Sequence, residues 1–225
     1  DNSHDGIAVT TSVGTTPQKR ESVKVAYDAI ISDLENAINK LPEENNGYAT
    51  SWAAKALMAQ VAFQMGDYVS AGNMANDVIQ SGQFTLSDTV NVFDASASSE
   101  HIYSIISFGV NDQRSGSYTS NFAAAVPVIQ MDKALYASFN NIDNDKRLQM
   151  LEVINKGAQN EFIKTTQFNA PYFNIPVIHL TMMHLIRAEA YAKPCGTFTL
   201  AIAFILFLPA FCFSSSFLFL VISPP

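Results

Sequence analysis

Two aspartates beside an arginine are the residues of this chain whose types and spacing come closest to hydrolytic chemistry. Asp143 and Asp145 lie in the polar stretch 140–147, which ends at Arg147. Glycoside hydrolysis requires two carboxyl groups about 5–10 Å apart across a sugar-sized cleft, one of them with a raised pKa. Nothing in the surrounding sequence indicates such a cleft, so we favour a solvated turn or a helix cap over a catalytic pair.

The histidines indicate no metal site. His4 and His101 are isolated, and His179 and His184 are five positions apart in a segment with helical periodicity. That spacing separates the two side chains by about 140° around a helix, so they do not share a face. The sequence also lacks a nucleophile elbow, an H-E-x-x-H zinc motif, a phosphate-binding P-loop and a dinucleotide fingerprint. We therefore predict no catalytic residues, no metal and no cofactor.

A polar stretch, 109–127, contains the residues best suited to binding a sugar without catalysis. Such binding needs flat aromatic faces for the apolar C–H patches of the ring and polar side chains for the hydroxyl groups. We predict a long loop here, with an ordinary surface loop anchored by two aromatic residues as the equally plausible alternative. The candidate ligand-binding residues are Gln113, Arg114, Tyr118, Asn121 and Phe122. The only tryptophan, Trp52, is assigned to packing.

The elements that must position these residues are mostly helices. Apolar residues recur with a 3.6-residue period from Ser22 to Leu41, and a second helix is expected from Thr50 to Met65. The second helix is rich in alanine, which indicates close approach to its neighbours. Gly66-Asp67 ends it, and a third helix follows to about Ser81, before Gly82. The last two helices form a hairpin of the tetratricopeptide type.

The remainder of the chain is less regular. An apolar segment at 100–107 is predicted to be a short strand or an irregular buried segment, and helices are expected at 132–139 and 179–192. Residues 148–170 show no clear period. The predicted fold class is mainly α: repeat-like helical hairpins with long irregular loops and few short strands.

Composition divides the chain into three parts. Among its 225 residues, 48% are hydrophobic and 15% charged, which argues against intrinsic disorder. The net charge of −7, with no basic cluster, argues against nucleic acid as a partner. Every charged residue lies at or before Lys193, whereas both cysteines follow it. We predict an extended lead-in (1–20), a helical domain (21–193) and a hydrophobic tail (194–225).

Four landmarks in this order resemble the SusD/RagB family of outer-membrane nutrient-binding lipoproteins. The first is YDAIISDLENA at 27–37, completed by Leu41-Pro42. The second is AAKALMAQV at 53–61, with GDY at 66–68. The third is EHIYSI at 100–105, followed by DKR at 145–147, and the fourth is PVIHL at 176–180 with LIRAEAYA at 185–192. The resemblance covers roughly residues 20–193. His179 stands where the family usually has Arg, and Met182 where it usually has Glu.

The resemblance implies a SusD-like α-α superhelix that binds oligosaccharides or polysaccharides without catalysis. Its expected partners are a glycan ligand and a SusC-like TonB-dependent transporter, to which the glycan would be delivered. It further implies a lipoprotein of the cell outer membrane, at the surface or facing the periplasm. The signal peptide, lipid-bearing cysteine and first repeat helices of that family are absent from this sequence, so we expect an internal-to-C-terminal fragment.

Two other functions and two interpretations of the tail stay open from the sequence. The main alternative function is a membrane-tethered, tetratricopeptide-like adaptor that binds a protein partner; a glycoside hydrolase is the weakest. Residues 198–222 carry no charge and are long enough to span a bilayer, so they are candidates for a membrane anchor. The abrupt change of composition after Lys193 favours an out-of-frame segment instead.

Overall fold

The computed structural model describes residues 3–11, 13–14, 17–109, 112–140 and 144–193, which form two compact units. Of the described residues, those up to Gly82 and those from Met182 onward form the first unit, and those from Gln83 to Thr181 form the second. The expected tail, 194–225, lies outside the described residues. Its two interpretations, a membrane anchor and an out-of-frame segment, therefore both stay expectations. Among the described residues, no helix has the length and apolar character needed to cross a membrane.

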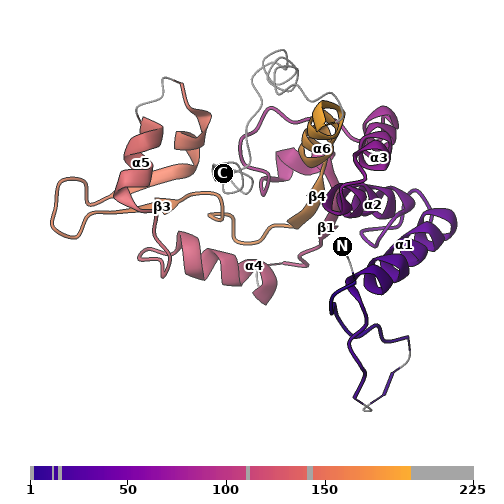
Figure 1. Cartoon of the computed structure of the whole chain (residues 1–225). Helices are drawn as coiled ribbons and strands as arrows, with labels where there is room; N and C mark the ends of the chain where they lie inside the picture. The colour runs from indigo at the N-terminus through magenta and orange to yellow at the C-terminus, as the bar shows by residue number, and fades with distance from the viewer. Residues whose placement is uncertain (1–2, 12, 15–16, 110–111, 141–143, 194–225) are drawn as a thin grey trace. The chain divides into compact units, whose positions relative to one another are not determined.

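Three successive helices in the first unit begin where the sequence predicts them. They are α1 (Val23–Lys40), α2 (Ser51–Met65) and α3 (Tyr68–Gln80) (Figure 1). The Ser22 side chain accepts a hydrogen bond from the Val25 amide at 3.3 Å, and Thr50 accepts one from the Ala53 amide at 3.1 Å. Each cap satisfies one of the backbone donors that a helix start leaves without a partner.

The turn between α2 and α3 confirms the predicted hairpin. Gly66 ends α2 with φ +82°, a left-handed conformation that a residue with a Cβ adopts at a cost. Asp67 follows at once and caps α3 by accepting a hydrogen bond from the Ser70 amide at 3.1 Å. The two helices therefore run antiparallel after a two-residue connection.

Alanines make the contact surface of this hairpin, as their density in the sequence indicates. Ala56 and Ala59 of α2 and Ala71 and Ala75 of α3 are completely buried. Small side chains allow the two backbones to approach closely, so the hairpin is held by backbone proximity and dispersion. A second cluster, formed by Leu34, Ala54 and Met58, packs α1 against α2.

The last helix, α6 (Leu180–Ala192), packs against α3 through its residues of the first unit. A Cβ added to Gly72 would lie 2.6 Å from the Tyr191 ring and 3.3 Å from the Ala190 side chain, so only glycine fits without a shift. Arg187 donates a hydrogen bond to the Asn76 side chain at 2.9 Å. Arg187 therefore has a structural role in this helix pair.

The second unit contains two separate two-stranded antiparallel sheets. In one, β1 (His101–Ile105) pairs with β4 (Ile175–His179), and His101 lies opposite His179. In the other, β2 (Leu151–Ile154) pairs with β3 (Phe162–Thr165). The helical segments around them are η1 (Ala95–Glu100), α4 (Gln113–Tyr118), the π-helical turn η2 (Thr119–Ala123), α5 (Lys133–Asn140) and the 3-10 helix η3 (Lys146–Met150). In Figure 1, α5 lies beside β3.

The structure differs from the sequence-based expectation in one loop. Residues 113–123 are helical, so the predicted long loop at 109–127 is wrong over this part. Asp112 starts the helix by accepting a hydrogen bond from the Arg114 amide at 3.0 Å. The Thr119 hydroxyl then donates to the Phe168 carbonyl at 3.1 Å, a tertiary contact that holds a segment of weak helix formers.

Elsewhere the fold class is confirmed as mainly helical with few short strands. The β2–β3 hairpin lies within 148–170, where the sequence showed no clear period.

Asp145, for which the sequence predicts a turn or a cap, caps η3 by accepting a hydrogen bond from the Arg147 amide at 2.9 Å. Its carboxylate also pairs with the Arg147 guanidinium, and this hydrogen bonding holds the pKa of Asp145 below its ordinary value. Asp143 lies outside the described residues.

Candidate functional site

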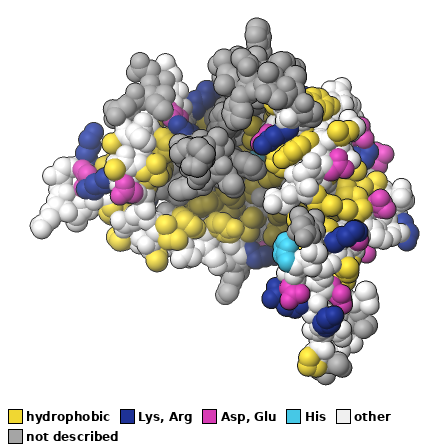
Figure 2. All heavy atoms as spheres, in the orientation of Figure 1, with side chains coloured by type: hydrophobic (Ala, Val, Ile, Leu, Met, Phe, Trp, Pro, Cys, Tyr) yellow, Lys and Arg dark blue, Asp and Glu magenta, His cyan; other side chains and the backbone are white. Residues whose placement is uncertain are grey.

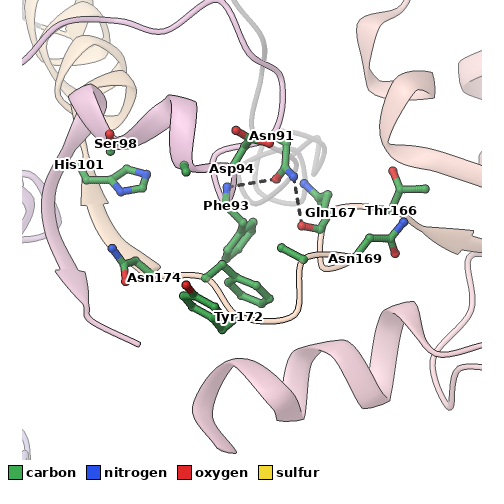
Figure 3. Close-up of a pocket in the computed structure, with 13 residues that line it drawn as sticks. Asn91, Phe93, Asp94, Ser98, His101, Thr166, Gln167, Asn169, Tyr172 and Asn174 are labelled. Atoms are coloured by element: carbon green, nitrogen blue, oxygen red, sulfur yellow. Dashed lines mark hydrogen bonds between the residues drawn. The ribbon is translucent and has the colours of Figure 1, made fainter. Parts of the chain in front are cut away.

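A cleft of about 500 Å³ lies within the second unit, between two segments far apart in the sequence. Residues 91–101 run through η1 into β1, and residues 166–174 connect β3 to β4 (Figure 3). The cleft is lined mainly by short polar side chains and aromatic rings. These residues are Asn91, Phe93, Asp94, Ala95, Ser98, His101, Thr166, Gln167, Asn169, Ala170, Tyr172, Phe173 and Asn174.

The first wall of the cleft is fixed by the cap of η1. Oδ1 of Asp94 accepts hydrogen bonds from the Ser96 amide at 2.8 Å and the Ser96 hydroxyl at 2.7 Å. These bonds favour the ionised carboxylate and hold the pKa of Asp94 below its ordinary value of 3.8. At the other end of η1, Nε2 of His101 lies 2.8 Å from the Val92 carbonyl oxygen. That oxygen can only accept, so the His101 ring nitrogen donates.

The second wall is fixed by hydrogen bonds to its flanking segments. The Thr166 amide donates to the Met150 carbonyl at 2.8 Å, at the end of the β2–β3 hairpin. Oδ1 of Asn174 accepts a hydrogen bond from the Ser107 amide at 3.1 Å, just beyond β1. The Asn174 amide NH₂ is thereby oriented as the group available to a ligand.

Asn91 joins the two walls directly. Its Nδ2 donates to the Gln167 carbonyl at 3.1 Å, while its Oδ1 accepts from the Phe93 amide at 3.1 Å (Figure 3). One side chain therefore sets the separation of residues 91–93 from residue 167. Polar groups held in this way lose little freedom when a ligand binds.

An aromatic cluster joins the same two segments beside the cleft. It consists of Phe93, Tyr118, Phe122, Phe168 and Phe173. The shortest distance between ring centroids, 4.7 Å, is between Phe93 and Phe168 in an edge-to-face arrangement. Phe168 and Phe173 are only 7% and 6% exposed. The cluster therefore supplies the apolar burial that holds the cleft in shape, with each ring pair contributing roughly 0.5–1.5 kcal/mol beyond burial.

The exposed groups of the cleft suit hydroxyl-rich ligands. Tyr172 is 48% exposed and presents an aromatic ring, while Ser98 and Asn169 are exposed polar side chains. An aromatic face with amide and hydroxyl groups around it can contact both the C–H patches and the hydroxyl groups of a sugar. Asp94 is the one carboxylate among the described residues that line the cleft, whereas glycoside hydrolysis ordinarily uses two.

Arg114, Tyr118, Asn121 and Phe122, four of the five residues predicted from the sequence, lie elsewhere in the second unit, and none of these four lines the cleft. Tyr118 and Phe122 belong to the aromatic cluster; the Tyr118 ring centroid is 6.2 Å from those of both Phe93 and Phe173, which do line it. The side-chain Nδ2 of Asn121 donates a hydrogen bond to the Ser117 backbone carbonyl at 2.7 Å. Of Gln113, the structure describes only the backbone.

Arg114 is occupied by its own neighbours. Its Nε donates to Asp112 Oδ1 at 2.9 Å, and its guanidinium lies 5.5 Å from the Phe108 ring centroid. These hydrogen bonds hold the pKa of the Asp112 carboxyl far below its ordinary value. The arrangement resembles that of Asp145 and Arg147, and it keeps the Arg114 charge close to a compensating carboxylate.

Sequence reasoning did not identify the cleft. One signal was present: the run Asn169-Ala-Pro-Tyr172-Phe-Asn174 places aromatic residues between two asparagines, the mixture that we sought in another segment. The histidines form no metal site in the described part of the chain, where no group of three metal-binding side chains is found. His179 is largely buried, and burial lowers its pKa.

Charge on the surface does not mark an alternative site. On the face shown in Figure 2, the Lys and Arg side chains of the described residues lie interspersed with Asp and Glu side chains. In the second unit, four cations are paired with carboxylates: Arg114 with Asp112, Lys133 with Glu161, Arg147 with Asp145 and Lys164 with Glu152. Compensated charges of this kind do not form an attractive field for a polyanion.

No protein-family model and no curated protein matches this sequence. Solved structures do match. A SusD superfamily protein from Bacteroides thetaiotaomicron VPI-5482 superposes with a TM-score of 0.72 at 24% identity, covering 91% of this chain and 51% of that one. A putative sugar binding protein from Bacteroides vulgatus ATCC 8482 also gives 0.72, at 22% identity, covering 91% and 49%. The surface glycan-binding protein A from Bacteroides uniformis gives 0.67 at 16% identity, covering 91% and 53%.

These likenesses confirm the predicted resemblance at the level of the fold. The chain has the fold of SusD superfamily proteins over nine tenths of its length. It spans about half the length of the solved structures that it matches.

Proposed function

We propose that this chain, which has the SusD superfamily fold, binds an oligosaccharide or polysaccharide in the cleft without catalysing its cleavage. The observation that carries the proposal is the composition of the cleft: a half-exposed tyrosine ring surrounded by oriented amide and hydroxyl groups. Relatives in fold that are named as sugar-, carbohydrate- or surface glycan-binding proteins support the same ligand class. The single carboxylate of the cleft supports binding without hydrolysis.

The setting of this binding is also a proposal. We infer that the chain works at the cell surface in nutrient uptake and delivers its glycan to a SusC-like TonB-dependent transporter. The inferred attachment is an N-terminal lipid anchor to the outer membrane. The surface glycan-binding protein from Bacteroides uniformis, which shares the fold, supports a location at the cell surface.

The residues singled out from the sequence have a place in this proposal. Tyr118 is proposed to support the cleft through its ring contacts with Phe93 and Phe173, and Phe122 is proposed to support it indirectly, by packing on Tyr118 and Phe168. Gln113, Arg114 and Asn121 are proposed to contact parts of a longer glycan that extend beyond the cleft.

Tyrosine substitution tests the proposal with a matched control. Tyr172, 48% exposed, lines the cleft, and Tyr48, 75% exposed, lies in the first unit. Both Tyr→Ala changes remove a ring at an exposed position, so each should change the free energy of unfolding by less than about 0.5 kcal/mol. Losing a stacking ring worth roughly 1–1.5 kcal/mol should weaken glycan binding about five- to tenfold in Tyr172→Ala only.

Affinity electrophoresis in gels containing a panel of polysaccharides gives the readout. Unchanged chain should be retarded by at least one polysaccharide, Tyr172→Ala should lose most of that retardation, and Tyr48→Ala should keep it. The proposal is contradicted if no polysaccharide retards the chain, or if the two variants behave alike.

A further inference from the structure

The lining of the cleft carries little charge. Its described residues include one carboxylate, Asp94, and neither lysine nor arginine. Among the described lining residues, His101 is the one whose side chain can gain a positive charge, and its Nε2 hydrogen is already donated to the Val92 carbonyl. All other polar lining groups are neutral amides, hydroxyls and the Tyr172 phenol. The cleft can therefore offer hydrogen bonds to a ligand, but no fixed positive charge.

The carboxylate is held in its ionised form and stays partly available. Both hydrogen bonds that Asp94 accepts from Ser96 go to Oδ1, and among the described residues none is found to Oδ2. Its side chain is exposed at the start of η1. Asp94 therefore places a negative charge on the cleft wall, where a second oxygen can accept from a sugar hydroxyl.

The cations of the second unit do not compensate for this charge. It contains six lysine and arginine residues, none of which lines the cleft, and four of them pair with carboxylates elsewhere. Recognition of a carboxylate or sulfate ordinarily relies on arginine or lysine, because an anion leaves water at a high cost without an ionic partner. An acidic sugar unit inside the cleft would therefore meet neutral dipoles and the Asp94 charge.

We propose that the cleft selects neutral glycans and discriminates against acidic ones, with Asp94 as a specificity-determining residue. The proposal deepens the function proposed above and rests on it. Two effects weaken the binding of an acidic sugar: it gains no ion pair in the cleft, and it is repelled by Asp94. A neutral sugar meets neither penalty and can donate a hydroxyl hydrogen to the Asp94 carboxylate.

Matched ligands make the test specific for charge. The chain is first screened by affinity electrophoresis at neutral pH against both neutral and uronic-acid polysaccharides. Every polymer that binds is then converted to its counterpart: primary hydroxyls are oxidised to carboxylates, or carboxyl groups are reduced to alcohols. The two members of a pair share their linkages, so a difference in dissociation constant reports the charge.

We expect the acidic member of each pair to bind at least about fivefold more weakly, the effect of one like charge at contact distance in water. Added salt should narrow that difference, because it screens the repulsion. Asp94→Asn, which keeps an Oδ1 acceptor for the Ser96 cap, should also narrow it. Asp88→Asn makes the same change of net charge outside the cleft. It should therefore leave the ratio of the two dissociation constants, acidic to neutral, unchanged in each pair.

Each result separates the two proposals. If no polymer of either kind binds, the proposed function fails. If polymers bind but acidic members bind as tightly as neutral ones, or more tightly, glycan binding stands and the selectivity proposal is overturned. The selectivity proposal is equally overturned if Asp94→Asn and Asp88→Asn change the ratio alike.

Discussion

The aromatic cluster provides the most quantitative prediction, because one ring contacts four others. Phe168 is 7% exposed, and its ring centroid lies 4.7 Å from that of Phe93, 5.2 Å from Tyr118, 5.5 Å from Phe122 and 5.6 Å from Phe173. Truncation to alanine removes this buried ring and leaves a cavity among the four others. Phe168→Ala should therefore lower the free energy of unfolding by about 3–5 kcal/mol.

The control is the same change at an exposed position of the same unit. Phe108 is 86% exposed, and the interaction that its ring makes is with the Arg114 guanidinium. Phe108→Ala should cost less than roughly 1 kcal/mol. Urea unfolding followed by circular dichroism measures both variants. If Phe168→Ala is no more destabilising than Phe108→Ala, the aromatic cluster does not hold the second unit together.

Three further features of the fold, a helix cap, a left-handed glycine and an ion pair, are tested by four substitutions. Thr50→Ala removes the cap of α2 and should lower the free energy of unfolding by about 1 kcal/mol, measured by urea unfolding. Gly66→Ala places a Cβ at φ +82° with open space around it, so the cost is backbone strain of about 1 kcal/mol. The same change at Gly116, in α4 with equally open space, should be neutral or stabilising. Asp145→Asn breaks the pair with Arg147. The pKa of Asp145 in the folded chain lies below its ordinary value of 3.8. The ion pair therefore stabilises the fold at pH values above 3.8, and this stabilisation is lost as the pH falls from 3.8 through the lower, folded-state pKa. Unfolding curves should thus show a deficit for Asp145→Asn at pH 7 that shrinks toward about pH 2; a pH-independent deficit would contradict the ion pair's role.

The helices of the first unit were predictable because their signals are local. Caps at Ser22 and Thr50, a 3.6-residue period and a glycine in the left-handed conformation all act within a few residues of the chain. The density of alanine even indicated the close contact of α2 with α3. Local propensity and tertiary packing agree here, so sequence patterns suffice.

The cleft was not predictable in the same way, because it depends on contacts between residues about 75 positions apart in the sequence. Asn91 bonds to Gln167, and Phe93 packs on Phe168, but neither pair leaves a periodic trace in the sequence. The helix at 113–118 was missed for a related reason. Its serines and glycine are weak helix formers, and its neighbour Thr119 is held by the Phe168 carbonyl. Tertiary contacts decide the conformation there.

The location of the glycan is the central claim, and hydrogen exchange tests it most directly. Exchange of backbone amides is measured on the chain alone and with a saturating neutral polysaccharide that retards it in the gel. The account predicts slower exchange at residues 91–101 and 166–174, with α1 and α2 unchanged. Protection confined to other segments, or none at either wall of the cleft, would contradict it.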